Sequence, residues 1–133
     1  MTEPVVYLSP GWRDEAERRL KAELTADKMK NITTSMSNLY KNCPGGVDKY
    51  LFVKFVDGGL ADVRVGEGDP PEAEFKITGD YEVFARITQG QIKSQRALMS
   101  GKLKLRGNMV KALKLASLAD RMNKVLAAIP AQY

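Results

Sequence analysis

Histidine is absent from this chain of 133 residues, and cysteine occurs once, at position 43. The lack of histidine removes the commonest general base and the commonest metal ligand, which excludes Ser-His and Cys-His catalysis. It also excludes zinc sites built from cysteine and histidine. A single cysteine excludes an intrachain disulfide and favours a reducing compartment.

Long apolar runs are also missing. No stretch approaches the roughly 18 apolar residues that a membrane-spanning helix needs. The segment Met1–Pro4 lacks the basic region and apolar run of a signal peptide. The last residues, Ala131–Tyr133, differ from the Ser-Lys-Leu type of peroxisomal signal. These features predict a cytoplasmic protein.

Acidic side chains are scarce in the last third of the chain. Residues 86–133 hold ten Lys and Arg against one acid, Asp120, a net charge of +9, whereas residues 1–85 have a net charge of −4. Such asymmetry indicates an anionic partner, for which membrane head groups, nucleic acid and phosphate-bearing molecules all qualify. A solvated surface without a partner is the alternative. Single-strand binding needs aromatic side chains among the cations, and this segment has only Tyr133, so no nucleic acid is expected.

The length and composition suit one globular domain over residues 1–133. The chain is 44% hydrophobic and 28% charged, which is ordinary for a globular protein. A chain of this length buries about two thirds of the surface that is exposed when it is unfolded, so it can build a core without disulfides or bound metal ions.

Two helices are predicted before the first strand. Ser9 is the expected N-cap of the first, which has an apolar stripe with a period of four residues from Trp12 to Leu24. The second is predicted to begin near Asp27 and to stop before the breaker at 43–46. Its expected apolar face consists of Met29, Ile32, Met36 and Leu39.

Three consecutive strands follow. The segment 50–56 is almost wholly apolar, 60–65 alternates, and Asp57-Gly58-Gly59 between them is typical of a hairpin turn. A third strand is predicted over 73–78. Three strands in succession favour an antiparallel meander.

The remaining elements are a helix capped by Asp80 and running to about Thr88, and a short helix over 94–100. A basic strand over 102–106 follows, and then a helical pattern from 109 to about 128, which is either one helix or two with a bend near Ser117. We therefore predict an α+β fold: a single, mostly antiparallel sheet of four or five strands with helices packed on one side.

Two segments together resemble a known family. They are Phe75–Tyr81, a strand followed by a capped helix, and Gln95–Met109. In the second, a Gly-Lys pair enters an alternating strand, Gly107 closes it, and Asn108 precedes a methionine. This pattern is similar to the sterol carrier protein type two family, with the resemblance clearest over residues 47–129. Residues 25–46 match no named pattern.

The resemblance implies an apolar cavity between sheet and helices that binds a fatty acid, fatty acyl-CoA, sterol or other lipid and transfers it without catalysis. Methionines suit such a wall because they repack around varied ligands; the alternative is that they fill an ordinary core. No cofactor and no metal is expected. The predicted ligand-binding residues are Phe55, Phe75, Phe84, Ile87, Ile92, Leu98, Met99, Leu103, Leu105, Met109, Leu113, Leu118 and Met122.

The basic strand and the helix after it are expected to contact an anionic surface, either membrane lipid or the phosphates of an acyl-CoA. The predicted contact residues are Lys102, Lys104, Arg106, Lys111 and Lys114. Gly101 and Gly107 bound this strand, and we expect its ends to turn sharply or to pass close to another backbone.

Other functions stay open as alternatives. An accessory subunit that presents a lipid to an enzyme partner would use the same cavity, and a dimer or another protein partner stays open too. A basic nucleic-acid-binding module is less favoured. An enzyme is not expected, because Asp80 and Glu82 lie on different helix faces and Cys43 has no histidine to activate it.

Overall fold

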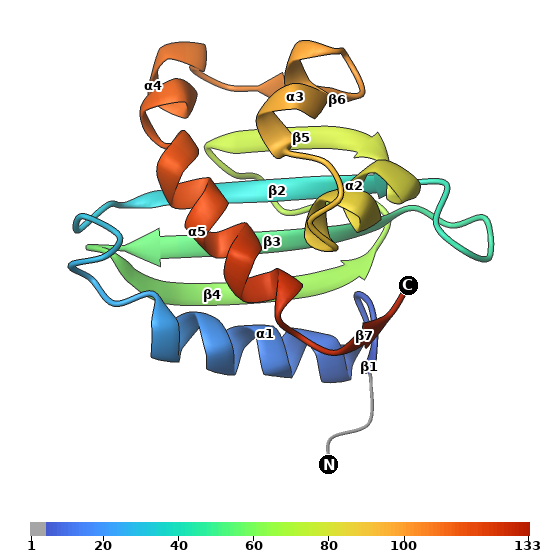
Figure 1. The fold of residues 1–133 in the computed structure, drawn as a ribbon, viewed down its shortest axis with the longest axis horizontal. Helices are drawn as coiled ribbons and strands as arrows, with labels where there is room; N and C mark the ends of the chain where they lie inside the picture. The colour runs from blue at the N-terminus through green and yellow to red at the C-terminus, as the bar shows by residue number, and fades with distance from the viewer. Residues whose placement is uncertain (1–4) are drawn as a thin grey trace.

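A computed structural model describes residues 5–133, with a mixed sheet covered on one face by helices (Figure 1). Met1–Pro4, on which the expectation about a signal peptide rests, lie outside the described residues. The elements in order are β1 (Val5–Val6), α1 (Pro10–Glu23), β2 (Thr34–Lys41), β3 (Lys49–Val56), β4 (Gly59–Glu67), β5 (Phe75–Asp80), α2 (Tyr81–Thr88), α3 (Ser94–Met99), β6 (Leu103–Arg106), α4 (Met109–Lys114), α5 (Ala116–Ala127) and β7 (Ala131–Gln132).

The main sheet has five strands in the order β4-β3-β2-β5-β6. All neighbouring pairs are antiparallel except β2 and β5, which run parallel with Met36 opposite Phe75. The predicted α+β class, strand number and one-sided helices are confirmed. A two-stranded parallel pair, β1 with β7, joins the two ends of the described chain, with Val5 opposite Ala131.

The helix predicted to run from near Asp27 to the breaker at 43–46 is wrong. Residues 26–31 form turns with Lys30 and Asn31 at positive φ, and β2 begins at Thr34. Apolar residues three and four apart fit a helix, but β2 alternates, so Met36 faces the helices and Leu39 the other side of the sheet. Threonine, serine and asparagine are weak helix formers, and pairing with β3 and β5 on both edges decides the conformation in favour of a strand.

The expected meander of three consecutive strands is also incorrect. β3 and β4 form the predicted hairpin, with positive φ at Asp57 and Gly58 in the turn. The chain after β4 then crosses the face of the sheet opposite the helices, and β5 pairs with β2 instead of β4. The hydroxyl of Ser37 donates to the carbonyl of Pro71 at 2.7 Å, which ties this crossing segment to the centre of the outer face.

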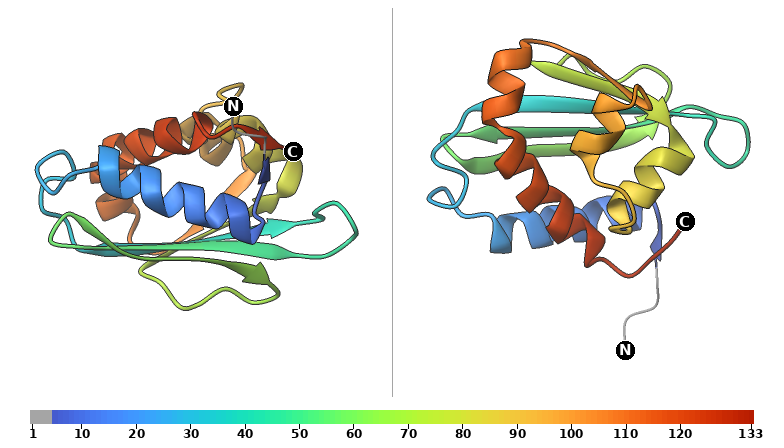
Figure 2. Two further views of the ribbon diagram at one scale, coloured as in Figure 1. Left: turned by 90° about the horizontal axis from the view of Figure 1, so that it is seen from below. Right: turned by 45° about the horizontal axis from the view of Figure 1, so that its top comes forward.

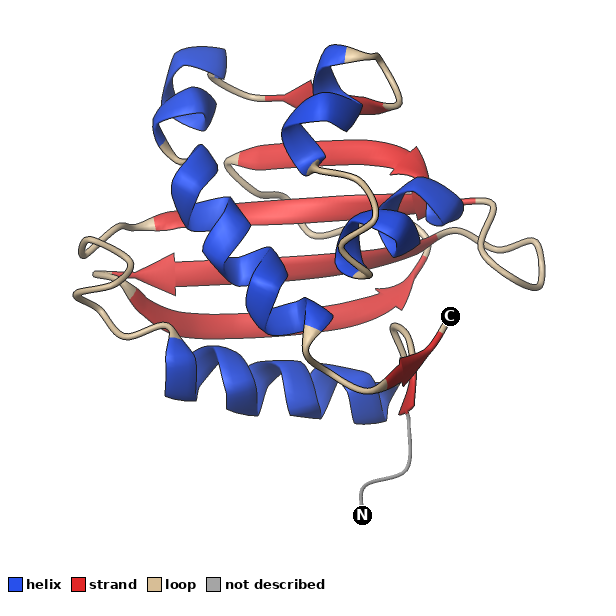
Figure 3. Cartoon of the chain, viewed as in Figure 1, coloured by secondary structure: helices blue, strands red, loops and turns tan. Residues whose placement is uncertain are grey.

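The helices form one layer over the sheet (Figures 2 and 3), and the loop between β4 and β5 crosses the opposite face (Figure 2). α1 begins as predicted, with the Ser9 side chain accepting from the Trp12 backbone N–H at 3.3 Å. Its stripe is buried: Trp12, Ala16 and Leu20 have no exposed surface. α1 lies along β4 and α5, which closes one side of the core.

Of the two alternatives for the final helical stretch, the structure has two helices, and α4 and α5 meet at Leu115 rather than near Ser117. The Asn108 side chain caps α4 by accepting from Lys111 N–H at 3.1 Å. α2 does begin after Asp80, but the Asp80 side chain makes no cap hydrogen bond and instead accepts from Asn42 Nδ2 at 3.0 Å.

Candidate functional site

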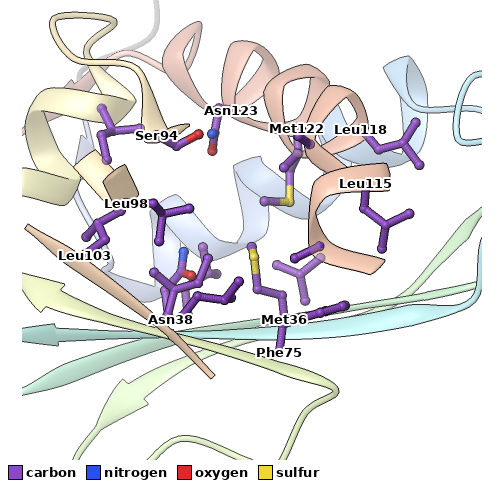
Figure 4. A pocket seen from close by; sticks show the side chains of 18 of the residues that line it. Met36, Asn38, Phe75, Ser94, Leu98, Leu103, Leu115, Leu118, Met122 and Asn123 are labelled. Carbon is purple, nitrogen blue, oxygen red and sulfur yellow. The ribbon is translucent and has the colours of Figure 1, made fainter. Parts of the chain in front are cut away.

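A cavity of about 180 Å³ lies between the sheet and the helical layer (Figure 4). A water molecule needs only about 15 Å³ of such volume, so the cavity has room for a much larger guest. Its lining is mostly apolar, and none of the described residues that line it is charged. An apolar cavity with a few polar groups is typical of a small-molecule site.

Alternation along the strands builds the floor, because every second side chain points to the same face. The floor consists of Thr34, Met36, Asn38 and Tyr40 from β2, Leu51, Val53 and Phe55 from β3, Phe75 and Ile77 from β5, and Leu103 and Leu105 from β6.

Four of the helices, α2 to α5, contribute to the roof. It consists of Phe84, Ile87 and Thr88 from α2, Ser94, Gln95 and Leu98 from α3, Met109, Ala112 and Leu113 from α4, and Ala116, Leu118, Ala119, Met122, Asn123 and Leu126 from α5. Tyr7, Met29, Ile32 and Leu115 complete the lining.

The structure brings eleven of the thirteen predicted ligand-binding residues into this lining: Phe55, Phe75, Phe84, Ile87, Leu98, Leu103, Leu105, Met109, Leu113, Leu118 and Met122.

Ile92 and Met99 do not line the cavity, so placing them there was wrong. Ile92 packs against the core from the segment before α3. Met99 is 90% exposed. Successive residues of a helix point about 100° apart, so when Leu98 takes the inward position of α3 its neighbour Met99 faces outward.

Sequence reasoning missed the contribution of β2, because that segment was assigned to a helix. The alternation of Thr34, Met36, Asn38 and Tyr40 was the available signal. It also missed Tyr7, which enters the core ahead of α1 and packs edge-on against Trp12 with ring centroids 5.0 Å apart.

One end of the cavity is polar. The hydroxyl of Tyr7 lies 3.1 Å from Thr88 Oγ1 and donates to Tyr40 Oη at 3.5 Å. Asn38 Nδ2 donates to the same Tyr40 oxygen at 3.3 Å. Burial raises the pKa of Tyr40 to about 12 and the pKa of Tyr7 well above its ordinary value. Both phenols are therefore neutral hydroxyl groups at physiological pH.

The cavity opens beside α4. Met109 and Leu113 line it although their side chains are 55% and 68% exposed, and their neighbour Val110 is exposed as well. No residue of α4 is buried. A helix with so little packing gains little stability from the hydrophobic effect.

Exposed cations lie on α4 and on the edge strand β6, where they alternate with the inward-facing Leu103 and Leu105. Lys102, Lys104, Arg106 and Lys114 are exposed and form no ion pair with any residue from 5 to 133. Lys111 differs, because its ammonium group contacts Glu74 Oε2 at 2.5 Å. This pair, together with a hydrogen bond from Thr34, lowers the pKa of Glu74.

Among the described residues that line the cavity, none is a cysteine, an aspartate or a glutamate. Cys43 is buried, and burial raises the pKa of its thiol, which keeps it in the unreactive protonated form. Over residues 5–133, no group of three His, Cys, Asp or Glu side chains is arranged to hold a metal ion. The same residues include no helix long and apolar enough to cross a membrane.

The family model described as the SCP-2 sterol transfer family matches residues 14–120. The chain belongs to this family. Its fold agrees: a crystal structure of sterol carrier protein 2 superimposes with a TM-score of 0.80 at 20% identity, covering 92% of this chain and 98% of that one. The predicted resemblance is therefore confirmed, and the family is one of lipid-binding and transfer proteins.

Two relatives frame the comparison. A "non-specific lipid-transfer protein-like 1" from Caenorhabditis elegans is 30% identical over 103 residues, which is 76% of this chain and 84% of that protein. A "hydroxysteroid dehydrogenase-like protein 2" from Bos taurus is 30% identical over 126 residues, which is 94% of this chain but only 29% of that protein. The chain thus spans less than a third of the length of the bovine relative.

Proposed function

We propose that this chain binds one apolar lipid in the cavity between sheet and helices and transfers it without catalysing a reaction. The observation that supports this most is a cavity of about 180 Å³ whose lining is uncharged and largely apolar. The chain that contains it belongs to a sterol transfer family. Affinity would come chiefly from buried methylene groups, at about 0.8 kcal/mol each. The eleven predicted lining residues are the proposed ligand contacts.

Two neighbouring positions on α3 allow a matched test. Leu98→Trp places a large ring in the cavity, whereas Met99→Trp places the same ring in solvent. Uptake of a fluorescent fatty acid or fluorescent sterol should fall about tenfold or more in the first variant, because each displaced methylene removes about 0.8 kcal/mol. The second variant should bind like the parent protein.

Native mass spectrometry of the purified protein, followed by organic extraction, would identify any lipid that copurifies. An empty protein that also takes up neither fluorescent lipid would contradict the proposal, and the cavity would then be an ordinary gap in the core.

The mouth of the cavity supports a second part of the proposal: docking on an anionic membrane. Exposed apolar side chains on α4 follow directly on the edge strand β6, whose cations, like Lys114, form no ion pair among residues 5–133, and each Lys or Arg near an anionic bilayer contributes about 1 kcal/mol. Apolar residues at the rim would enter the interface and let the lipid pass without crossing water. The proposed docking residues are Met109, Val110, Leu113, Lys102, Lys104, Arg106 and Lys114.

Vesicle cosedimentation tests this face. Lys102→Gln with Lys104→Gln should weaken binding to vesicles containing phosphatidylglycerol about thirtyfold at low salt, from two lost cation contacts. Lys41→Gln with Lys54→Gln makes the same change in net charge on exposed residues of β2 and β3, and it should have a much smaller effect. An equal loss of vesicle affinity in the two double variants, or vesicle binding that does not depend on salt concentration, would refute the proposal that this face docks on membranes.

The bovine relative favours one variation on this function. Because the similar region is a minor part of a longer protein named as dehydrogenase-like, the chain would in that arrangement present its lipid to an enzyme partner. Copurification of a dehydrogenase with a tagged chain from its native cells would support presentation. A monomer that moves lipid between vesicles unaided would support free carriage.

A further inference from the structure

The two margins of the main sheet are covered differently. At one margin α1 lies along β4, and Arg13 Nε donates to the Val63 carbonyl at 2.9 Å. At the other margin β6 pairs with β5 alone (Figure 1), and no backbone hydrogen bond from a loop or helix of the described chain reaches residues 103–106. Alternate residues of an antiparallel strand direct their N–H and C=O groups to opposite sides. Part of the β6 backbone therefore faces outward without a partner among the described residues.

Three cations gather on the outer face of this margin. The inward-facing residues of β5 and β6 line the cavity, so Lys76, Lys104 and Arg106, which alternate with them, point to the opposite face. Lys76 lies directly opposite Arg106 in the strand register. None of the three forms an ion pair with another residue from 5 to 133. Like charges directly opposite one another destabilise a sheet, so this arrangement leaves a need for negative charge.

The rest of the sheet does not share this deficit. Each of the other four cations in its strands has an acidic residue opposite in the register or in an ion pair: Lys41 with Asp80, Lys49 with Glu67, Lys54 with Asp62, and Arg64 with Asp62. The two acids nearest to Lys76 along the chain, Glu74 and Asp80, already have partners in Lys111 and Asn42. Cations on an edge strand protect it from self-pairing, but that reason does not apply to Lys76, which lies on the interior strand β5.

We propose that β6 is the docking edge for an extended acidic segment of a partner protein. The segment pairs with the free backbone of β6 as an added strand, and its alternate Asp or Glu side chains lie beside Lys104 and Arg106 and relieve the repulsion at Lys76. A second copy of β6 would set like charges opposite one another, which disfavours self-association at this edge. This surface is separate from the cavity, so the inference does not depend on which lipid the chain binds.

Fluorescence anisotropy of the labelled peptide Glu-Val-Glu-Val-Glu-Val at low salt measures this docking. Its matched probe is the same peptide with every backbone nitrogen methylated, which keeps the charge but has no backbone donor. We expect the methylated peptide to bind about tenfold more weakly or worse, the effect of losing two or more backbone hydrogen bonds. Backbone amides of β6 should exchange with solvent more slowly when the unmodified peptide is bound, because an added strand protects them.

Substitutions at the margin test the part played by charge. Lys104→Gln with Arg106→Gln should weaken peptide binding about tenfold, from two lost opposite-charge pairs across strands. Lys41→Gln with Lys54→Gln makes the same change in net charge at cations that have acids opposite, and it should weaken binding by less than about twofold at moderate salt, where distant charges are screened. Arg106→Gln alone should raise the thermal midpoint by about 1–4 °C, since it ends the repulsion with Lys76.

The outcomes separate a protein partner from a membrane. Equal affinity for the two peptides, equal losses in the two double variants, or a lower thermal midpoint in Arg106→Gln would overturn the inference. If vesicles containing phosphatidylglycerol bind and the unmodified peptide does not, the cations serve membrane docking alone and the inference is again overturned. Lys104 and Arg106 are also proposed membrane contacts, so peptide and vesicle should compete for the chain. None of these measurements involves the cavity, so each result leaves the lipid-binding proposal unaffected.

Discussion

Gly101 and Gly107, at the two ends of β6, give a prediction in which two identical substitutions have different costs. Both have positive φ, +81° and +137°. A Cβ built on Gly101 meets nothing within 4 Å, whereas a Cβ on Gly107 lies 2.9 Å from the Glu74 carbonyl oxygen and 2.7 Å from Phe75 Cδ1. The expectation that the strand ends turn sharply holds at both glycines, and the close approach to another backbone occurs only at Gly107.

The magnitudes follow from these contacts. Alanine at Gly101 costs about 1–2 kcal/mol for the left-handed backbone, offset by about 0.4–1 kcal/mol from a less flexible unfolded chain. A net loss of about 1 kcal/mol is expected. Alanine at Gly107 would be overpacked against the Glu74 carbonyl oxygen and the Phe75 ring, which costs about 1–3 kcal/mol. The positive φ of this position costs alanine about 1–3 kcal/mol more. The expected net loss there is about 2–5 kcal/mol.

Urea unfolding, followed by far-ultraviolet circular dichroism, measures both losses, and the thermal midpoint gives a second reading. With about 4 °C per kcal/mol for a chain of this size, Gly107→Ala should lower the midpoint by about 10–20 °C and Gly101→Ala by about 4 °C. A loss at Gly101 as large as that at Gly107 would refute the assignment of the cost to the contacts with Glu74 and Phe75.

Three further predictions concern stability. Leu20→Ala in α1 should cost about 2–5 kcal/mol by urea unfolding, since the side chain has no exposed surface, whereas Leu113→Ala, at an exposed position, should cost less than about 0.5 kcal/mol; equal losses would mean that α4 is packed. Hydrogen bonds from Arg18, which have the largest effect, and from Arg19 lower the pKa of Glu15 to about 2. The resulting contribution to folding stability is present above the ordinary carboxyl pKa and is lost as pH falls. Glu15→Gln should therefore give a slightly flatter stability profile below about pH 4.3, and an unchanged profile would contradict this. Burial raises the pKa of Tyr40 to about 12, so its contribution is present below about pH 10 and lost as pH rises through 12. Tyr40→Phe should weaken the alkaline fall in stability, and spectrophotometric titration of the parent should show a phenol ionising late.

Local chemistry in the sequence was enough for several elements. The segment 50–56, the turn at Asp57-Gly58 and the return strand are a contiguous hairpin, and the alternation of Leu103 and Leu105 with cations places the leucines on the inner face. These predictions succeeded because each depends on neighbours within about ten residues. The motif over 95–109 identified the family for the same reason: its glycines and its alternation are local.

What only the tertiary structure decided is the identity of β2 and the polar end of the cavity. The apolar spacing from Met29 to Leu39 fits a helix as well as a strand, and it is pairing with β3 and β5, from later in the chain, that makes this segment the centre of the sheet. The group of Tyr7, Asn38, Tyr40 and Thr88 joins residues up to 81 positions apart. The periodicity of the sequence does not predict that these four residues come together. Hydrogen bonds between distant segments depend on strand register and layer packing, which exist only once the chain has folded.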